Sequence, residues 1–132
     1  MVKLSPDVKE VIQKQKPLPI ATADSTGKPN VVFVGTWKFI DDETIMIVDN
    51  FFKKTAVNLK ANPRLSIVAY DSESKQSYQV KGSVDYLDEG DRFDEAKAIA
   101  QAKNLPGKAV VIFHIEEVYD AVYGKHAGEQ IA

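Results

Sequence analysis

Lys53 and Lys54 stand where a short helix is expected to begin, because the stretch 49–63 leaves room for one helix over roughly 53–61. A helix start presents partial positive charge and unpaired N–H groups, so two cations there are mildly unfavourable unless an anion joins them. With the Thr55 hydroxyl, the two ammonium groups predict a seat for a phosphate group. A solvated lysine pair on a surface helix is the simpler alternative, and it is favoured while the stretch is considered alone.

A second group of interest is Gly35, Thr36 and Trp37, late in a run of β-branched and aromatic residues. A glycine inside a strand often marks a bulge or the close approach of a ligand. The planar ring of Trp37 beside such a gap could flank a flat ligand ring, although a core position explains its spacing equally well. Together with the phosphate seat, this group predicts a phosphorylated ligand that carries a flat ring.

Other kinds of chemistry find little support in the sequence. There is no cysteine, which excludes disulfides, thiolate nucleophiles and zinc ribbons. His114 and His126 are too few for a histidine-based metal cluster, and His114 lies inside an apolar strand. The acidic pairs 41–42 and 116–117 are expected to be solvated turn residues. Neither GxGxxG nor GxxxxGK[ST] occurs, so a dinucleotide or nucleoside triphosphate fold is not indicated.

The composition is that of one globular domain, with 132 residues, 44% hydrophobic and 27% charged. A formal charge of −2 gives no electrostatic footprint for nucleic acid. No apolar run approaches the length of a membrane span, and the N-terminal residues lack the apolar core of a signal peptide. We therefore expect a cytoplasmic protein with neither nucleic-acid nor membrane partners.

Hydrophobic periodicity and turn residues predict an alternation of short elements. Expected helices cover about 5–15, 53–61 and 91–103, and expected strands cover 20–23, 31–39, 44–48, 64–70, 78–86 and 109–115, the last extended by 118–123 beyond a break at 116–117. Continuous apolarity over 44–48 predicts that both faces of that strand are covered. The tail 124–132 is expected to pack loosely.

Most links between these strands are short, so the sheet should be largely antiparallel. The strands outnumber what one half-exposed open sheet needs, and several are apolar on both faces. We therefore predict a mainly β protein of the α+β class: one small, closed or nearly closed barrel over residues 1–132, with a few short flanking helices.

Several short motifs occur in an order that resembles a known family. They are Ile20-Ala21-Thr22-Ala23, Gly27-Lys28-Pro29, Gly35-Thr36-Trp37, Lys53-Lys54-Thr55, Asn58-Leu59, Asn62-Pro63, Val80-Lys81-Gly82-Ser83, Phe93-Asp94-Glu95-Ala96 and Ala109-Val110-Val111-Ile112. Over roughly residues 18–121, the chain resembles the FMN-binding split barrels related to pyridoxamine 5′-phosphate oxidase. Within that group it is similar to the short bacterial FMN-binding proteins.

The resemblance implies a split barrel that holds FMN at a homodimer interface. It places the phosphate at Lys53, Lys54 and Thr55, with Asn58 nearby, and it places Asp49, Asn50 and Phe51 near the ring. It further implies that Val34, Gly35, Thr36 and Trp37 run along the flavin and ribityl chain, and that Gln76 and Ser77 offer a further contact.

The chain also departs from the oxidase pattern. After Arg92 it has neither a tryptophan nor the arginine-bearing substrate motif, and the arginine usual on the second strand is missing. Oxidation of pyridoxamine phosphate is therefore not expected. Lysines hold a phosphate with less bidentate geometry than arginine, which predicts modest affinity.

The leading hypothesis is a dimeric flavoprotein that acts as a redox carrier or as a small flavin-dependent oxidoreductase, with a nicotinamide or protein electron donor. Because the isoalloxazine ring carries the redox chemistry, no side chain need act as acid or base, and enzyme status stays open. The alternatives are a deazaflavin-dependent reductase on the same fold, a non-catalytic module that binds or stores flavin, and a barrel without cofactor.

Overall fold

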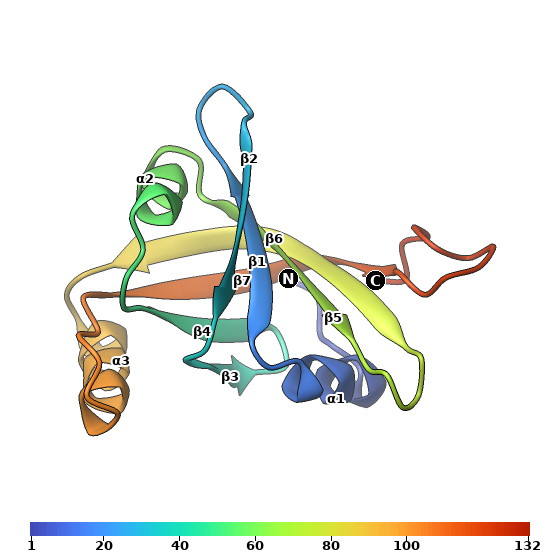
Figure 1. Cartoon of the computed structure of the whole chain (residues 1–132), viewed down its shortest axis with the longest axis horizontal. Coiled ribbons are helices and arrows are strands. Elements are labelled where there is room, and N and C mark those ends of the chain that lie inside the picture. The colour runs from blue at the N-terminus through green and yellow to red at the C-terminus, as the bar shows by residue number, and fades with distance from the viewer.

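A single curled sheet dominates the structure, a computed structural model that describes residues Met1–Ala132 (Figure 1). The helices are α1 (Pro6–Lys14), α2 (Lys54–Ala61) and α3 (Asp91–Ala102), and the strands are β1 (Leu18–Ala23), β2 (Pro29–Val34), β3 (Trp37–Asp41), β4 (Thr44–Asp49), β5 (Arg64–Tyr70), β6 (Ser77–Leu87) and β7 (Ala109–Asp120). The sheet has the order β2-β1-β5-β6-β7-β4-β3, and every pair is antiparallel. The predicted class, mainly β and antiparallel with short helices, is confirmed.

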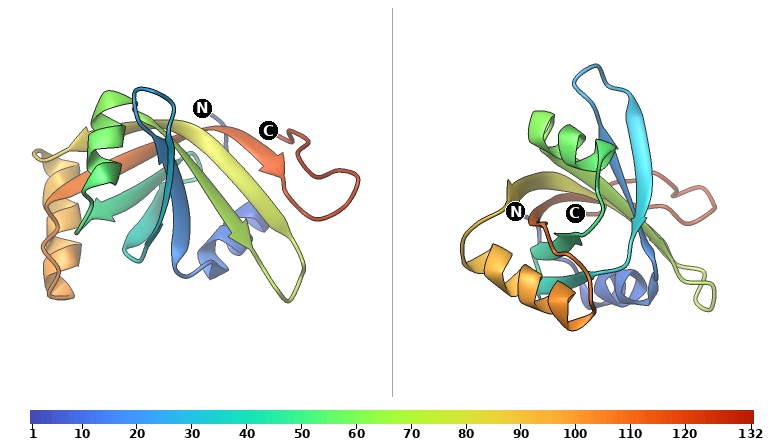
Figure 2. Two further views of the ribbon diagram at one scale, coloured as in Figure 1. Left: turned by 45° about the horizontal axis from the view of Figure 1, so that its top comes forward. Right: turned by 60° about the vertical axis from the view of Figure 1, so that its left-hand side comes forward.

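The barrel is split between its two edge strands, β2 and β3, which follow each other in the chain but do not pair. The sheet curls round between them, as the two views of Figure 2 show. The prediction of one continuous strand over 31–39 is wrong, because the chain leaves β2 after Val34 and Trp37 begins a new strand. The Thr36 carbonyl accepts a hydrogen bond from the Val48 N–H at 3.0 Å, which ties this corner to β4.

The interior of the barrel holds one apolar cluster of 19 buried residues. Alternate strand residues point inward, as a period of two requires, and Phe113 on β7 and Ile67 on β5 are fully buried there. Helix α1 adds Val8 and Ile12 to this cluster. The helix begins as expected from its sequence, with Ser5 as N-cap accepting from the Val8 N–H and Pro6 at the first helical position.

β4 is covered on both faces, as its continuous apolarity predicts, and all six of its residues are buried. Ile45 and Ile47 join the barrel interior. On the other face, Met46 and Val48 belong to a second cluster with Ala96 and Ala100 of α3. This double burial fixes the end of β4, from which the chain departs toward α2.

The long strands β6 and β7 pair through a bulge. Lys81 lies opposite Glu117 and Gly82 lies opposite Ile115, so Glu116 is an extra residue on β7. The expected break at 116–117 is therefore a bulge inside one continuous strand. Gly82 is required at this point, because a Cβ there would lie 1.9 Å from the His114 carbonyl oxygen.

The C-terminal segment 124–132 is exposed throughout. Its last residues run back along β7, where the Ile131 N–H donates to the Val118 carbonyl at 2.8 Å and the Val118 N–H donates to the Ala132 carbonyl at 3.1 Å. No helix in the structure combines the length and the apolar character that crossing a membrane requires.

Candidate functional site

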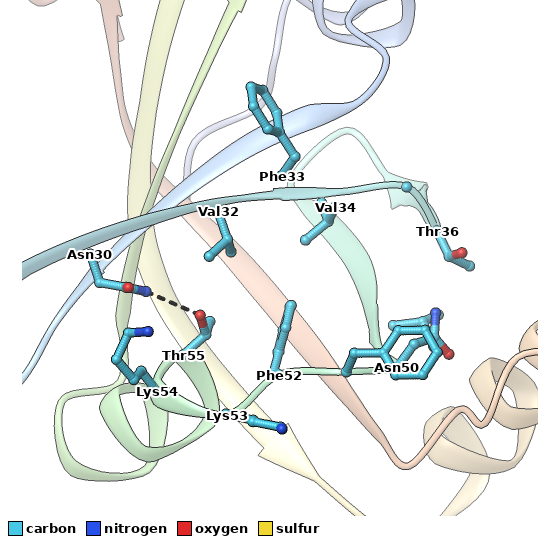
Figure 3. Close-up of a pocket in the computed structure, with 13 residues that line it drawn as sticks. Asn30, Val32, Phe33, Val34, Thr36, Asn50, Phe52, Lys53, Lys54 and Thr55 are labelled. Atoms are coloured by element: carbon cyan, nitrogen blue, oxygen red, sulfur yellow. Dashed lines mark hydrogen bonds between the residues drawn. The ribbon is translucent and has the colours of Figure 1, made fainter.

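A cavity of about 390 Å³ opens between β2 and the segment that joins β4 to α2 (Figure 3). Its lining residues come from these two parts of the chain: Asn30, Val32, Phe33, Val34, Gly35, Thr36, Val48, Asn50, Phe51, Phe52, Lys53, Lys54 and Thr55. Small-molecule sites in proteins usually have volumes of about 300–1,000 Å³. We call this cavity the β2–α2 cavity.

One part of the β2–α2 cavity is an apolar slot. Val32 and Val34 point from β2 toward Phe52 across the cavity, whereas Phe33 points to the other side of the strand (Figure 3). Strand alternation explains this difference, because neighbouring side chains leave opposite faces of a sheet. The slot therefore has two apolar walls, one from a regular strand and one from the loop before α2.

The other part of the cavity is cationic and lies at the start of α2. Lys53 is the N-cap residue, its side chain makes no capping hydrogen bond, and no acidic residue lies in the first turn. Lys54 opens the helix, and neither lysine forms an ion pair with a carboxylate. Two uncompensated ammonium groups beside a helix start provide a binding position for an anion.

Buried polar side chains hold this end of the cavity in place. The Asn30 amide donates to Thr55 Oγ1 at 3.0 Å and to Thr22 Oγ1 at 3.2 Å, and the Asn58 amide donates to Thr22 Oγ1 at 3.1 Å. Thr22, Thr55 and Asn58 are all buried. These bonds fix α2 against the β1–β2 hairpin, so the position of the lysines relative to β2 is set by the fold.

Asp49 lies beneath the cavity wall and is fully buried. Its Oδ1 accepts from the Phe52 N–H at 2.8 Å, and its Oδ2 accepts from the Tyr86 hydroxyl. Burial, and then the bond to Asp49, raise the pKa of Tyr86 well above its ordinary value. Lys108 Nζ lies 3.8 Å from Asp49 Oδ1.

The wall is also tied to the loop between α3 and β7. Lys108 Nζ donates to the Phe52 carbonyl at 2.5 Å, and the Gly107 N–H donates to Asn50 Oδ1 at 2.9 Å. The segment from Asn50 to Lys53 is therefore held from below by Asp49 and from the side by this loop.

The residues predicted for the site fall into three groups. Those that line the β2–α2 cavity are Val34, Gly35, Thr36, Asn50, Phe51, Lys53, Lys54 and Thr55. Asn58 lines an adjoining hollow, and Asp49 lies under the wall. The third group, Trp37, Gln76 and Ser77, does not line the cavity. Trp37 packs against the barrel core, Gln76 lines a hollow beside α1, and Ser77 Oγ donates to the Ala69 carbonyl.

Several cavity residues were not predicted from the sequence, chiefly Asn30, Val32 and Phe52. One available signal was Thr22, a polar residue at an inward position of β1 after Leu18 and Ile20. A buried hydroxyl needs a hydrogen-bond partner, which Asn30 and Asn58 provide here.

Neither histidine lies at the cavity. His114 Nε2 lies 2.8 Å from Asp85 Oδ2, and His126 Nδ1 lies 3.1 Å from Glu129 Oε2. No cluster of three or more histidine, cysteine, aspartate or glutamate side chains in the structure is arranged to hold a metal ion. The only charged side chains that line the cavity are lysines. The arrangement therefore suits a ligand that has both an apolar part and an anionic group.

Comparison with known proteins identifies relatives for almost the whole chain. Residues 4–121 match the pyridoxamine 5′-phosphate oxidase family. An uncharacterised protein of Methanocaldococcus jannaschii is 34% identical over 117 residues, which cover 86% of this chain and 78% of that protein. The heme oxygenase HutZ of Vibrio cholerae is 32% identical over 74 residues, which cover 55% of this chain. This match covers 40% of HutZ. A separate match, to the pyridoxine/pyridoxamine 5′-phosphate oxidase of Cupriavidus necator, covers 55% of that enzyme.

Solved structures share the fold. HupZ of Group A Streptococcus superposes with a TM-score of 0.81 at 28% identity, covering 95% of this chain and 99% of HupZ. An FMN-binding protein of Syntrophomonas wolfei superposes with a TM-score of 0.73 at 20% identity, covering 89% of this chain and 90% of that protein, and at this identity the likeness shows the fold alone. With a family match over residues 4–121 and a similar relative above 30% identity, the chain belongs to the pyridoxamine 5′-phosphate oxidase family.

Proposed function

We propose that this protein binds FMN in the β2–α2 cavity and serves as a redox flavoprotein. The observation that carries the proposal is the joining of an apolar slot to two unpaired lysines at a helix start, in one cavity of about 390 Å³. A flavin mononucleotide has the matching parts, which are a flat ring and a terminal phosphate. Membership of the pyridoxamine 5′-phosphate oxidase family supports the same assignment.

The residues at the cationic end would hold the phosphate. Lys53 and Lys54 bring two positive charges, which oppose the charge of about −2 on a phosphate monoester near pH 7. Thr55 lies in the first turn of α2 and is held in place by the hydrogen bond from Asn30. No arginine lines the cavity, so the phosphate is held by ammonium groups without bidentate geometry, and we expect modest affinity.

The apolar slot would hold the ring. Val32 and Val34 lie across the cavity from Phe52, and the two walls would exclude water from the two faces of the ring (Figure 3). Bound flavin supplies one- and two-electron transfer, and the protein supplies position and polarity. In this role the residues that line the cavity bind and orient the cofactor.

The open side of the cavity supports a homodimer with the cofactor at its interface. Val31 and Phe33 on the outer face of β2 are 69% and 68% exposed, and Phe51 at the cavity is 71% exposed. Large apolar side chains in such numbers beside one cavity are typical of an interaction surface. We propose that a second copy of the chain covers them and completes the cofactor site.

The role that we propose for the bound flavin is that of a redox carrier or a small flavin-dependent oxidoreductase. The chain spans 55% of the length of the curated pyridoxine/pyridoxamine 5′-phosphate oxidase that it matches, and the reaction of that enzyme is not part of the proposal. Heme is the main competing ligand, because HutZ is named a heme oxygenase. The β2–α2 cavity has no histidine among its lining residues to act as an iron ligand.

The proposal is tested by identifying the ligand that the protein binds. Protein purified from cells is examined by visible spectroscopy, and any released chromophore is identified by mass; the apoprotein is then titrated separately with FMN and with heme. We expect flavin absorption bands, the mass of FMN, and saturable quenching of FMN fluorescence. A protein that leaves FMN fluorescence unchanged at all concentrations contradicts the proposal, and tight heme binding without flavin binding replaces it.

A further experiment separates the two redox roles. The FMN-loaded protein is mixed with NADH or NADPH under anaerobic conditions, and bleaching of the flavin absorption is followed. Rapid bleaching indicates an oxidoreductase with a nicotinamide donor. Reduction by dithionite alone indicates a carrier that receives electrons from another protein.

A further inference from the structure

A second hollow, of about 660 Å³, adjoins the β2–α2 cavity on the side of the β1–β2 turn. It lies between that turn, which contributes Asp24 and Lys28, and helix α2, which contributes Val57 and Asn58. Asn30, Lys53 and Lys54 line both spaces, so the two spaces adjoin at the cationic end. We call this space the hairpin hollow.

The hairpin hollow carries an excess of positive charge. Lys28, Lys53 and Lys54 line it together with a single carboxylate, that of Asp24. None of these lysines forms an ion pair. The Asp24 carboxylate is engaged in its own turn, where Oδ1 accepts from the Thr26 N–H at 2.8 Å, the Thr26 hydroxyl at 2.7 Å and the Lys28 N–H at 2.9 Å.

The same turn contacts fix the backbone that carries Lys28. Three hydrogen bonds to one carboxylate oxygen close the turn, and the Asp24 N–H also donates to the Lys28 carbonyl at 3.1 Å. These bonds lower the pKa of Asp24. Lys28 is thereby presented opposite the start of α2 from a defined backbone position.

The lining also indicates which part of a ligand the hollow recognises. No aromatic side chain lines it, and Val57 is its one large apolar residue. A charged group would meet the ammonium groups of Lys28, Lys53 and Lys54. The recognised group is therefore an anion.

We propose that the hairpin hollow accepts a second anionic group of the same ligand, so that this site takes a flavin extended by a diphosphate, with Lys28 contacting the added phosphate. The inference rests on the proposed FMN function. A single extended ligand fits better than two separate ones, because Lys53 and Lys54 serve both spaces. Two separate phosphate monoesters would bring a charge of about −4 to these lysines, whereas a diphosphate diester carries about −2.

The experiment compares FMN with FAD by isothermal titration calorimetry of the full-length apoprotein. Lys28→Ala removes the proposed contact from an exposed turn residue whose backbone bonds remain. Lys125→Ala, in the C-terminal segment, removes the same charge away from both cavities and serves as the control. We expect Lys28→Ala to weaken FAD about three- to fivefold while FMN affinity stays within about twofold, and Lys125→Ala to change neither.

Each outcome decides the question. If FMN binds but FAD does not, or if Lys28→Ala affects both flavins or neither, the inference fails and the FMN function stands. If ADP binds to the FMN-loaded protein and Lys28→Ala weakens it, the hollow takes a separate ligand and the inference also fails. If neither flavin binds, the proposed function and this inference fail together.

Discussion

Replacing Asp49 by alanine tests how the wall of the β2–α2 cavity is held. The carboxylate is fully buried and accepts hydrogen bonds from the Phe52 N–H and the Tyr86 hydroxyl. The substitution leaves both donors without this acceptor and frees the loop from β4 to α2 at its lower contact. Lys108 is half-exposed and only 3.8 Å away, so water can replace its interaction with Asp49.

The expected loss follows from these contacts. Each partly buried donor that is left unsatisfied lowers the free energy of unfolding by about 1–3 kcal/mol. The substitution also removes the desolvation penalty of a buried carboxylate, so the net loss for the two donors is about 3 kcal/mol. The exposed contact to Lys108 adds little. For a chain of this length, the loss corresponds to a fall in melting temperature of roughly 10 °C.

The assay is urea unfolding followed by the fluorescence of Trp37, the only tryptophan, which packs against the barrel core. Tyr86→Phe removes one of the two donors and should cost about 1 kcal/mol. In the double variant the two losses should not add, since both single changes remove the same bond. An Asp49→Ala protein within about 0.5 kcal/mol of the wild type, or strict additivity in the double variant, would refute this account of the wall.

Three further predictions concern single side chains. Gly82→Ala should lower the free energy of unfolding by about 3 kcal/mol or more, because the added Cβ would collide with the backbone of β7. Gly35→Ala, whose Cβ would have nothing within 4 Å, should lower it by less than about 1 kcal/mol, and urea unfolding measures both changes. Because the pKa of Tyr86 is raised in the folded state, stability is complete below pH about 10 and falls as the pH rises further, and Tyr86→Phe should lose less between pH 9 and pH 11. Thr55→Val removes the acceptor of the Asn30 amide and should lower the free energy of unfolding by about 1 kcal/mol, with weaker FMN binding by fluorescence titration.

Most of the fold could be predicted because local patterns agree with the tertiary structure. The structure has each feature that a local pattern predicts. Period two predicts the half-buried strands β5 and β6, continuous apolarity predicts that β4 is covered on both faces, and Ser5 followed by Pro6 predicts the start of α1. Gly35 was identified as a possible bulge, but the end of β2 at Val34 and the start of a new strand at Trp37 were not predicted, for a physical reason. A run of β-branched and aromatic residues predicts extended backbone in either case, whether the strand continues or the chain bends at two residues and starts a new strand that pairs with β4.

The site was predictable where one local feature defines it. Lys53 and Lys54 mark a helix start without acidic residues, which is a property of sequence. Asn30 and Phe52 could not be found in this way, because only the curl of the sheet brings β2 opposite the loop before α2.

The central claim, that Lys53 and Lys54 seat the phosphate of a flavin, is tested most directly by comparing FMN with riboflavin, which lacks the phosphate. Charge-assisted hydrogen bonds contribute about 1.5–3 kcal/mol, so the wild type should bind FMN at least about tenfold more tightly than riboflavin. In the Lys53→Ala/Lys54→Ala variant this preference should fall to near one, with riboflavin affinity unchanged and the melting temperature retained. A double variant that keeps the full preference for FMN, or a wild type that binds both flavins equally, would contradict the claim.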